Sequence, residues 1–346
     1  MKKSLLALAV LGAFAGVASA QSSVTLFGTL DVNGRYVKAD GQSRRLSEAT
    51  DGINSSQLGF RGVEDLGSGL KASFMLLSGV NPDAGTSNFA TTGTGVQQSK
   101  FWNRRSTVSL AGGFGEVRLG RDYTPTFWTQ TIFDAFGTNG LGSSLNVRQL
   151  YGGTRADNSI GYFLPSNIGG FYGQAMVAAS EGASQLDNSG RYEGARIGFA
   201  AGPFDVAGAA SQERKDLIAG APSQKTYNVG GSWDFGVAKL LGYWDRDTLQ
   251  TRKENVYSIS ALIPFGQSEV HVGYDRSTLD NAGAKTKIDQ IKATYQYNLS
   301  KRTAMYTTVS RLSNKDATRA TLPGANGPTT AGGKSSGAEF GLRHFF

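Results

Sequence analysis

The chain has 346 residues, with 35 lysines and arginines against 27 aspartates and glutamates, a formal net charge of +8 and no cysteine. The absence of cysteine excludes a disulfide framework, thiol chemistry and cysteine-based metal sites. The positive charge is small for this length and does not indicate a nucleic-acid partner. The 47 glycines and only 8 prolines suit closely spaced strands joined by tight turns.

Residues 1–20 have the pattern of a secretory signal peptide, with Lys2 and Lys3 before an apolar run and a small-residue ending. We expect export and a mature chain that begins near Gln21, with a formal charge of 33 − 27 = +6. A retained membrane helix is the alternative for this segment. After it, no run approaches the roughly 18 apolar residues that a membrane helix needs.

The first expected strand lies in SVTLFGTLDVNGRY at 23–36, and its side chains alternate between apolar and polar with a period of two. Leu26, Leu30 and Val32 fall on one face, and Asp31 and Arg35 fall on the other. The segments SQLGFRG, DNSIGYFLP and the terminal GAEFGLRHFF alternate in the same way. This pattern is typical of a transmembrane β-barrel, although a half-buried sheet in a soluble protein would also alternate.

The connections between the expected strands decide between these readings, because short and long segments follow each other strictly. The short ones are rich in turn residues and occur at 63–69, 111–115, 165–170, 201–205, 235–239, 264–268 and 298–302. The long ones are polar and occur at 39–54, 80–100, 122–156, 181–190, 211–224, 245–253, 276–285 and 312–335. Seven turns and eight loops predict an all-β, 16-stranded antiparallel transmembrane β-barrel over residues 21–346, with its short turns on the periplasmic side.

Several dispersed motifs carry a family resemblance: SSVTLFGTLDVNGRY, NSSQLGFRGVEDLGSGLKASF, NRRSTVSLAGGFGEVRLGRDYTP, FDAFGTNG, RADNSIGYFLP and GLRHFF. In this order, they resemble the general porins of Gram-negative outer membranes, in particular those of the Neisseria, Bordetella and Burkholderia group. The resemblance implies an outer-membrane homotrimer, surrounded by lipid and lipopolysaccharide, whose pores pass small anionic and neutral hydrophilic solutes.

In such porins the third external loop folds into the barrel and narrows the pore, and residues 122–156 occupy the place of that loop. The stretch 126–135 has few helix breakers and predicts a short helix. We expect the aromatic side chains of the loop to pack against the inner wall: Phe127, Trp128, Phe133 and Phe136. An ordinary external loop covering the mouth of the pore is the alternative.

The resemblance also implies which charged residues lie at the constriction. Asp134-Ala135-Phe136-Gly137 stands where related loops have a more acidic motif, so Asp134 is the remaining acid candidate near the loop tip. The matching basic positions are Arg61, Arg105, Arg121 and Arg148, with Arg155 as a weaker member. Alternation from Val117 and Leu119 points Arg121 outward, so Gly120 has to loosen the backbone there.

These residues predict a water-filled channel for passive diffusion with a preference for anions, since fixed charges act strongly at a narrow waist. The alternative is a non-conducting structural or adhesive barrel. An enzyme is not expected, because neither His271 nor His344 lies near an obvious serine and acid in the sequence. No metal-ligand spacing or phosphate loop stands out, so we also expect no cofactor.

Overall fold

The computed structural model describes residues 23–87, 100–180, 190–215 and 222–346. The predicted signal peptide therefore lies outside the described residues. The strands are β1 (Ser23–Ala39), β2 (Arg45–Thr50), β3 (Gln57–Gly67), β4 (Leu70–Asn81), β5 (Thr86–Ser87), β6 (Arg105–Gly112), β7 (Gly115–Tyr123), β8 (Arg155–Phe163), β9 (Phe171–Ala178), β10 (Tyr192–Ala201), β11 (Phe204–Arg214), β12 (Ser223–Asp234), β13 (Lys239–Leu249), β14 (Arg252–Phe265), β15 (Ser268–Asn281), β16 (Ala284–Asn298), β17 (Thr303–Lys315) and β18 (Lys334–Phe345). The helical elements are α2 (Pro125–Ile132), η1 (Gly140–Gly142) and η2 (Ser144–Val147).

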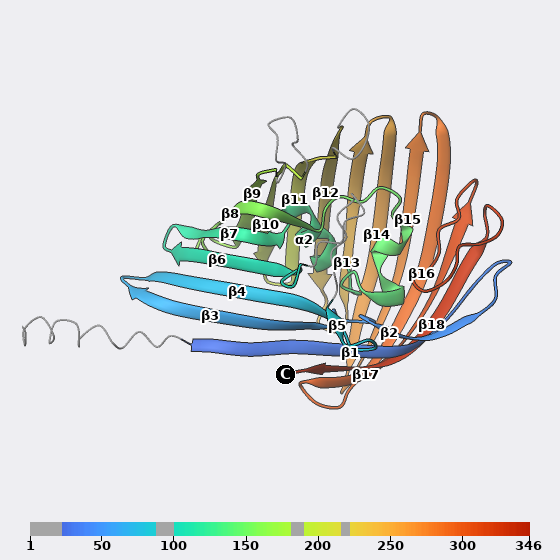
Figure 1. Ribbon diagram of the computed structural model, residues 1–346, viewed down its shortest axis with the longest axis horizontal. Helices are drawn as coiled ribbons and strands as arrows, with labels where there is room; N and C mark the ends of the chain where they lie inside the picture. Colours follow the sequence, from blue (N-terminus) through green and yellow to red (C-terminus); the bar gives the residue numbers. More distant parts are fainter. Residues whose placement is uncertain (1–22, 88–99, 181–189, 216–221) are drawn as a thin grey trace, which may run out of the picture.

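The strands form one closed antiparallel sheet (Figure 1). Of its 18 strands, β2 and β5 are short additions beside β1 and β4, so 18 − 2 = 16 strands make the wall. β18 pairs with β1 from Ala39 opposite Ser335 down to Thr29 opposite Phe345, which closes the barrel. The predicted sixteen-stranded antiparallel barrel is confirmed.

The alternation predicted for the strands is also confirmed, and it separates the two faces of the wall. In β1, Asp31 and Arg35 are buried, whereas Leu30 and Tyr36 are exposed. In β18, Glu339 is buried and Phe340 is exposed. Exposed apolar side chains therefore cover the outside of the barrel, and polar side chains line the inside, as in membrane barrels.

Two of the connections that the sequence predicts as long loops are two-residue hairpins. β13 ends at Leu249 and β14 begins at Arg252, and β15 ends at Asn281 just before β16 begins at Ala284. The prediction for 245–253 and 276–285 is therefore wrong, although the strand count does not change. These strand ends are polar on both faces, and this polarity made paired backbone resemble a loop.

No helix in the described part of the chain is long and apolar enough to cross a membrane.

The largest buried apolar cluster joins the inner wall to the segment 124–154, which connects β7 to β8. Phe133, Leu141 and Val147 of that segment are fully buried against wall residues such as Val256 and Ile288. In Figure 1, the green α2 helix and the turns after it are enclosed by the ring of strands.

Candidate functional site

The segment 124–154 is called the β7–β8 loop below. Hydrogen bonds join its two ends where it leaves the wall and returns to it. The backbone N–H of Thr124 donates to the carbonyl oxygen of Thr154 at 3.0 Å, and the Thr124 hydroxyl donates to that of Gly153 at 2.8 Å. Pro125 follows as the first helical residue, where its missing N–H costs nothing. The helix α2 therefore starts directly at the wall, within one residue of the predicted start.

The aromatic residues of the β7–β8 loop divide into two pairs. Phe133 packs over Gly230 of β12 and Phe136 over Gly273 of β15, two positions where a larger side chain would collide with the rings. Phe127 and Trp128 instead lie against Tyr123, with ring centroids 5.3 Å from it in both cases. The first pair fixes the tip of the loop against β12 and β15. The second pair fixes the base of the loop beside the end of β7.

Arg148 is one of the predicted constriction residues, and it lies in a buried ion pair. Its guanidinium donates to Asp245 Oδ1 at 2.7 Å and also to Asp247, and all three side chains are at most 1 % exposed. Burial lowers the pKa of Arg148, but the carboxylates of Asp245 and Asp247 outweigh burial and raise that pKa well above its usual value. The charge of Arg148 therefore persists and attaches the β7–β8 loop to β13.

Two neighbouring backbone groups extend this attachment to the next strand. The N–H groups of Gln149 and Leu150 donate to the two carboxylate oxygens of Glu254 on β14, at 2.8 Å and 2.6 Å. Glu254 is fully buried. A buried carboxylate is tolerated there because it accepts hydrogen bonds at both oxygens.

Asp134, the predicted acid of the constriction, forms a second buried attachment. Lys292 Nζ on β16 lies 3.4 Å from Asp134 Oδ1 and 2.9 Å from Asp275 Oδ2, and the three side chains are fully buried. Asp134 also accepts from the backbone N–H groups of Phe136 and Ser144. Asp134 is the only carboxylate and Arg148 the only basic side chain in residues 124–154, and both of them hold the loop to the wall.

A cluster of arginines surrounds Tyr123 at the end of β7. Arg155 donates to the Tyr123 hydroxyl at 2.8 Å, and its Cζ atom lies 4.3 Å from the ring centroid. The Cζ atom of Arg105 lies 5.6 Å from the same centroid. Arg104 directly precedes Arg105, and Arg121 lies on β7 opposite Ser106, the residue after Arg105. The structure therefore brings three of the predicted residues together: Arg105, Arg121 and Arg155.

The arginines of this cluster differ in their acid partners. Arg105 pairs with Asp122 at 2.6 Å, Arg104 pairs with Asp51 at 3.1 Å, and Arg118 shares Asp122 and adds Glu116. Arg155 forms no ion pair with the residues that the structure describes; its recorded polar partner is the Tyr123 hydroxyl. Arg155, the weaker member in the sequence, is thus the cluster arginine without a carboxylate.

Gly120 has the unusual backbone conformation that the placement of Arg121 was expected to require. Its φ is +120°, and the pairing of β7 with β8 shifts register between Gly120 and Asp122. The Arg121 guanidinium donates to the carbonyl oxygen of Asn103 at 2.7 Å and pairs with Asp157 at 2.6 Å. Lys100 pairs with the same Asp157 carboxylate.

Arg61 lies on β3, separate from Tyr123 but linked to the cluster. It is opposite Met75 in the β3–β4 register, and the Met75 sulphur accepts from Arg105 at 3.3 Å. Arg61 is exposed, its Cζ atom lies 5.2 Å from the centroid of the Phe27 ring, and it has no ion pair within the described ranges.

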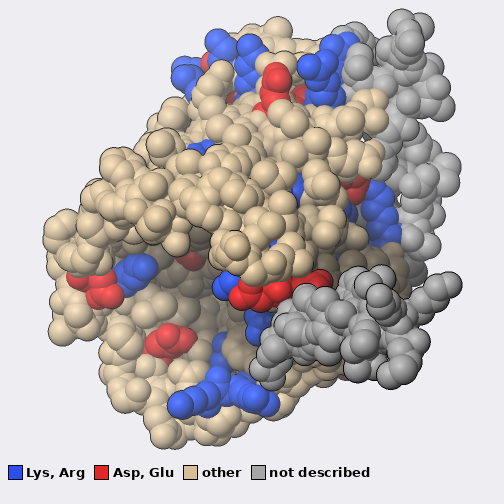
Figure 2. All heavy atoms as spheres, turned by 90° about the vertical axis from the view of Figure 1, so that its left-hand side faces the viewer, with Lys and Arg blue, Asp and Glu red and all other residues tan. Residues whose placement is uncertain are grey.

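Seen from the side of the β3–β4 and β6–β7 turns, the molecule is hollowed, and basic and acidic side chains line the hollow (Figure 2).

The sequence interpretation missed the wall residues that hold the β7–β8 loop. These are Asp245, Asp247, Glu254, Asp275 and Lys292. One signal was available: each lies at an inward-facing position of a strand whose outward neighbours include Trp244, Tyr257, Val272 or Ile291. A charged residue at an inward position of a spanning strand needs a partner, since burying an unpaired charge is costly.

The comparisons with known proteins agree with this architecture. A family model described as "Gram-negative porin" matches residues 7–317. The chain belongs to the Gram-negative porin family. The "Outer membrane porin protein 32" of Delftia acidovorans is 39 % identical to this porin over 365 residues, covering 100 % of both chains.

Two further similarities come from more distant sequences and from solved structures. The "Major outer membrane protein P.IB" of Neisseria gonorrhoeae is 29 % identical, over 88 % of this porin and 91 % of its own length. The solved structure titled "Anion-selective porin from Comamonas acidovorans" has a TM-score of 0.82 and 36 % identity, with 94 % of this porin and 100 % of that chain covered. This porin is therefore an outer-membrane barrel protein of the diffusion-channel type.

Proposed function

We propose that this porin conducts small anions in preference to cations, and that its preference arises where the β7–β8 loop narrows the pore beside the Tyr123 cluster. The observation that carries the proposal is that the loop brings no free charge to this place. Its acid Asp134 and its base Arg148 are both buried in ion pairs with the wall. The charge beside the passage then comes from the wall arginines.

The balance of charge around Tyr123 favours anions. Seven cations belong to the Tyr123 cluster or lie next to it: Lys100, Arg61, Arg104, Arg105, Arg118, Arg121 and Arg155. They face four carboxylates: Asp51, Asp122, Asp157 and Glu116. The formal sum of charge is 7 − 4 = +3. Arginine suits this role because it binds carboxylates and phosphates through paired, charge-assisted hydrogen bonds. The similarity to a porin whose title calls it anion-selective supports the same conclusion.

Within this proposal, the six sequence-predicted residues have two different roles. Arg61, Arg105, Arg121 and Arg155 supply positive charge along the path of the solute. Arg148 and Asp134 position the loop, since their side chains contact buried wall residues and have almost no exposed surface. A channel of this kind passes small anionic and neutral hydrophilic solutes without a cofactor.

The experiment is the reversal potential of the purified porin in a planar bilayer across a potassium chloride gradient. We expect an anion-selective potential in the wild type and a smaller one in the double variant R105Q/R121Q. The matched control K301Q/R302Q removes two exposed cations from the β16–β17 turn and should leave the potential unchanged. Cation selectivity of the wild type at low salt would overturn the proposal.

The same recordings distinguish two other functions. A structural or adhesive barrel would give no stepwise current at all. Catalysis is not part of the proposal: His344 Nδ1 lies 2.9 Å from the exposed Thr303 hydroxyl, and His271 lies 3.7 Å from Glu269, so neither histidine sits in a serine–histidine–acid arrangement.

A further inference from the structure

The helix α2 buries its polar side chains. Thr126, Thr129 and Gln130 are almost fully buried, and their spacing of three and four residues places them on one face of the helix. This face packs against the wall strands β10, β11 and β12. Gln130 donates to Asp245 Oδ2 at 2.7 Å, and the Thr129 hydroxyl accepts from Arg196 at 3.2 Å. Polar residues of α2 therefore hold the helix to the wall.

The opposite face of α2 is apolar and points away from the wall. It consists of Phe127, Trp128 and Ile132 and is called the aromatic face below. Phe127 and Trp128 are partly exposed, and Ile132 exposes 39 % of its surface. Because α2 lies inside the ring of strands (Figure 1), this face borders the passage through the barrel. The apolar face of a helix normally packs against the protein, and the interior of such a barrel is normally polar. The reversed helix therefore presents aromatic surface to passing solutes.

The aromatic face meets the arginine cluster at Tyr123. The ring centroids of Phe127 and Trp128 each lie 5.3 Å from that of Tyr123, and the Phe127 ring is inclined to the Tyr123 ring by only 12°. The Cζ atom of Arg155 lies 4.3 Å from the same Tyr123 centroid, and that of Arg105 lies 5.6 Å from it. Arg155 has no carboxylate partner in the part of the chain that the structure describes. Aromatic surface and a cation without an acid partner therefore share contact with one tyrosine ring.

We propose that this porin favours small aromatic carboxylates, such as benzoate, over aliphatic carboxylates of similar size and the same charge. The carboxylate of such a solute accepts charge-assisted hydrogen bonds from the arginines around Tyr123, while its ring lies against the aromatic face of α2. Aromatic rings gain from pairing with each other beyond the area that they bury, so the ring adds a preference that an aliphatic group lacks. The inference rests on the proposed anion preference, because the arginines must attract the carboxylate.

The test compares benzoate with cyclohexanecarboxylate, which has the same charge and a similar size but no aromatic ring. Each acid is added to the purified porin in a planar bilayer in potassium chloride, and the concentration that halves the chloride conductance is measured. In the wild type we expect this halving concentration to be about threefold to tenfold lower for benzoate. Equal halving concentrations in an anion-selective wild type would overturn this inference alone. Cation selectivity in potassium chloride would overturn the proposed function and the inference with it.

Variants of the site separate the effect of the rings from that of bulk and charge. F127L/W128L replaces both rings by aliphatic side chains and should bring the two halving concentrations to within about twofold of each other. F127Y/W128Y keeps a ring at each position and should retain the wild-type difference. Arg155→Gln should raise both halving concentrations by the same factor, because the two acids carry the same charge. A persisting difference in F127L/W128L would overturn the inference, and so would its loss in F127Y/W128Y.

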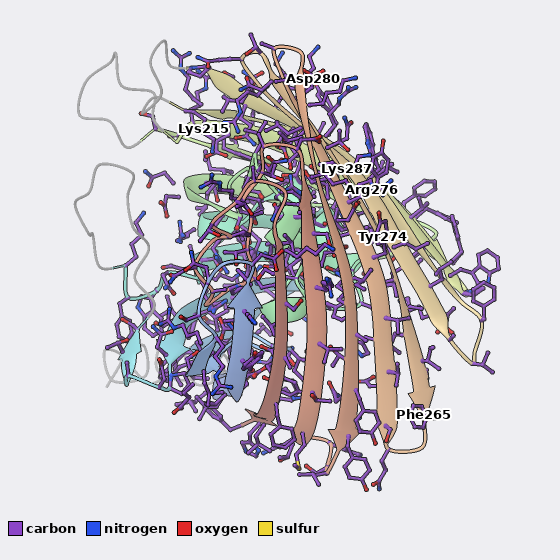
Figure 3. All side chains as sticks on the ribbon, turned by 90° about the vertical axis from the view of Figure 1, so that its right-hand side faces the viewer. Lys215, Phe265, Tyr274, Arg276, Asp280 and Lys287 are labelled. Atoms are coloured by element: carbon purple, nitrogen blue, oxygen red, sulfur yellow. The ribbon has the colours of Figure 1, made fainter. Side chains whose placement is uncertain are left out.

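Two controls test whether the effect belongs to this site. F235L/F265L removes two rings that expose 61 % and 51 % of their surface near the β12–β13 and β14–β15 turns, and it should keep the wild-type difference. Figure 3 shows Phe265 at the lower rim of the barrel. Benzyl alcohol, an aromatic solute without charge, should leave the chloride conductance unchanged at the concentration at which benzoate halves it. Loss of the difference in F235L/F265L, or a decrease by benzyl alcohol equal to that by benzoate, would overturn the proposal.

Discussion

At the scale of single residues, the role of each arginine depends on its partner more than on its position in the chain. Arg148 and Arg155 are seven residues apart, and the sequence places both at the constriction. Arg148 is held by two buried carboxylates, whereas Arg155 stacks on Tyr123 without a carboxylate partner in the described part of the chain. No pattern in the sequence distinguishes them, because their partners come from β13 and β7.

Arg155 is expected to contribute more to anion preference than its sequence context suggests. A unit charge about 5 Å from a passing ion is worth roughly 0.8 kcal/mol even in bulk water, which corresponds to roughly a three- to fourfold change in permeability ratio. Arg155→Gln should therefore lower the chloride-to-potassium ratio by about that factor, measured from reversal potentials. Arg155→Lys keeps the charge and should retain most of the preference; an equal loss in both variants would show that stacking on Tyr123 matters instead.

Gly120 gives a second prediction at the residue scale. Its φ of +120° is a conformation that side chains rarely adopt, and a Cβ atom there would collide with the carbonyl oxygen of Ser106. Strain of this kind costs about 1–3 kcal/mol. Gly120→Ala should lower the temperature at which the folded band is lost in detergent gels. Gly34→Ala is the matched control, because a Cβ atom on Gly34 meets nothing within 4 Å. Equal temperatures for the two variants would contradict this account.

At the scale of elements, the sequence predicts the strands better than the connections. Strict alternation identifies the wall strands because one face is covered by apolar side chains and the other by polar ones, as Leu30 and Asp31 of β1 illustrate. The hairpins at 250–251 and 282–283 could not be predicted in this way, because beyond the apolar band both faces of a strand are polar. Asp247 and Glu254 look like loop residues in the sequence, yet they are paired strand residues that hold the β7–β8 loop.

The attachment of the β7–β8 loop to β13 predicts a change in pore size. Removing one partner of a buried ion pair leaves unpaired charge and costs about 3–5 kcal/mol. Arg148→Met leaves Asp245 and Asp247 without their cation, so the loop should detach at its return limb. We expect larger, noisier conductance steps and faster entry of trisaccharides in liposome-swelling measurements.

Restoring the balance of charge should reverse this effect. R148M/D245N/D247N removes the two carboxylates together with the cation, and replacing a buried ion pair by neutral groups is often tolerated. This triple variant should therefore give quieter steps and slower trisaccharide entry than Arg148→Met alone. Wild-type conductance and swelling in the single variant would show that other contacts of the loop, such as Asp134 with Lys292, are sufficient to hold it.

At the scale of the whole molecule, the closed wall leaves its outer face to be covered by lipid or by further copies of the chain. We expect a homotrimer, as the family resemblance implies. Unheated protein extracted in mild detergent should migrate as a trimer and fall to a single-chain band after boiling. In the trimer, we expect the 80–100 loop to contact a neighbouring subunit; residues 88–99 of this loop lie outside the described ranges. A single-chain band without heating would count against the trimer.

The last prediction concerns how the anion preference of the whole channel depends on salt. Charges on the outer loops lie in open water, where the screening length is about 10 Å at 0.1 M salt and about 3 Å at 1 M. The arginines around Tyr123 are less exposed to solvent: Arg105 and Arg121 each expose less than a fifth of their side chains. Their effect should therefore persist at 0.1 M salt and decline towards 1 M. Reversal potentials recorded at a fixed concentration ratio should shrink steadily as mean salt rises in the wild type, and R105Q/R121Q should start from a smaller value and change less. A preference that is constant from 0.1 M to 1 M would mean that pore size or specific binding of chloride, rather than the field of these arginines, determines which ions pass.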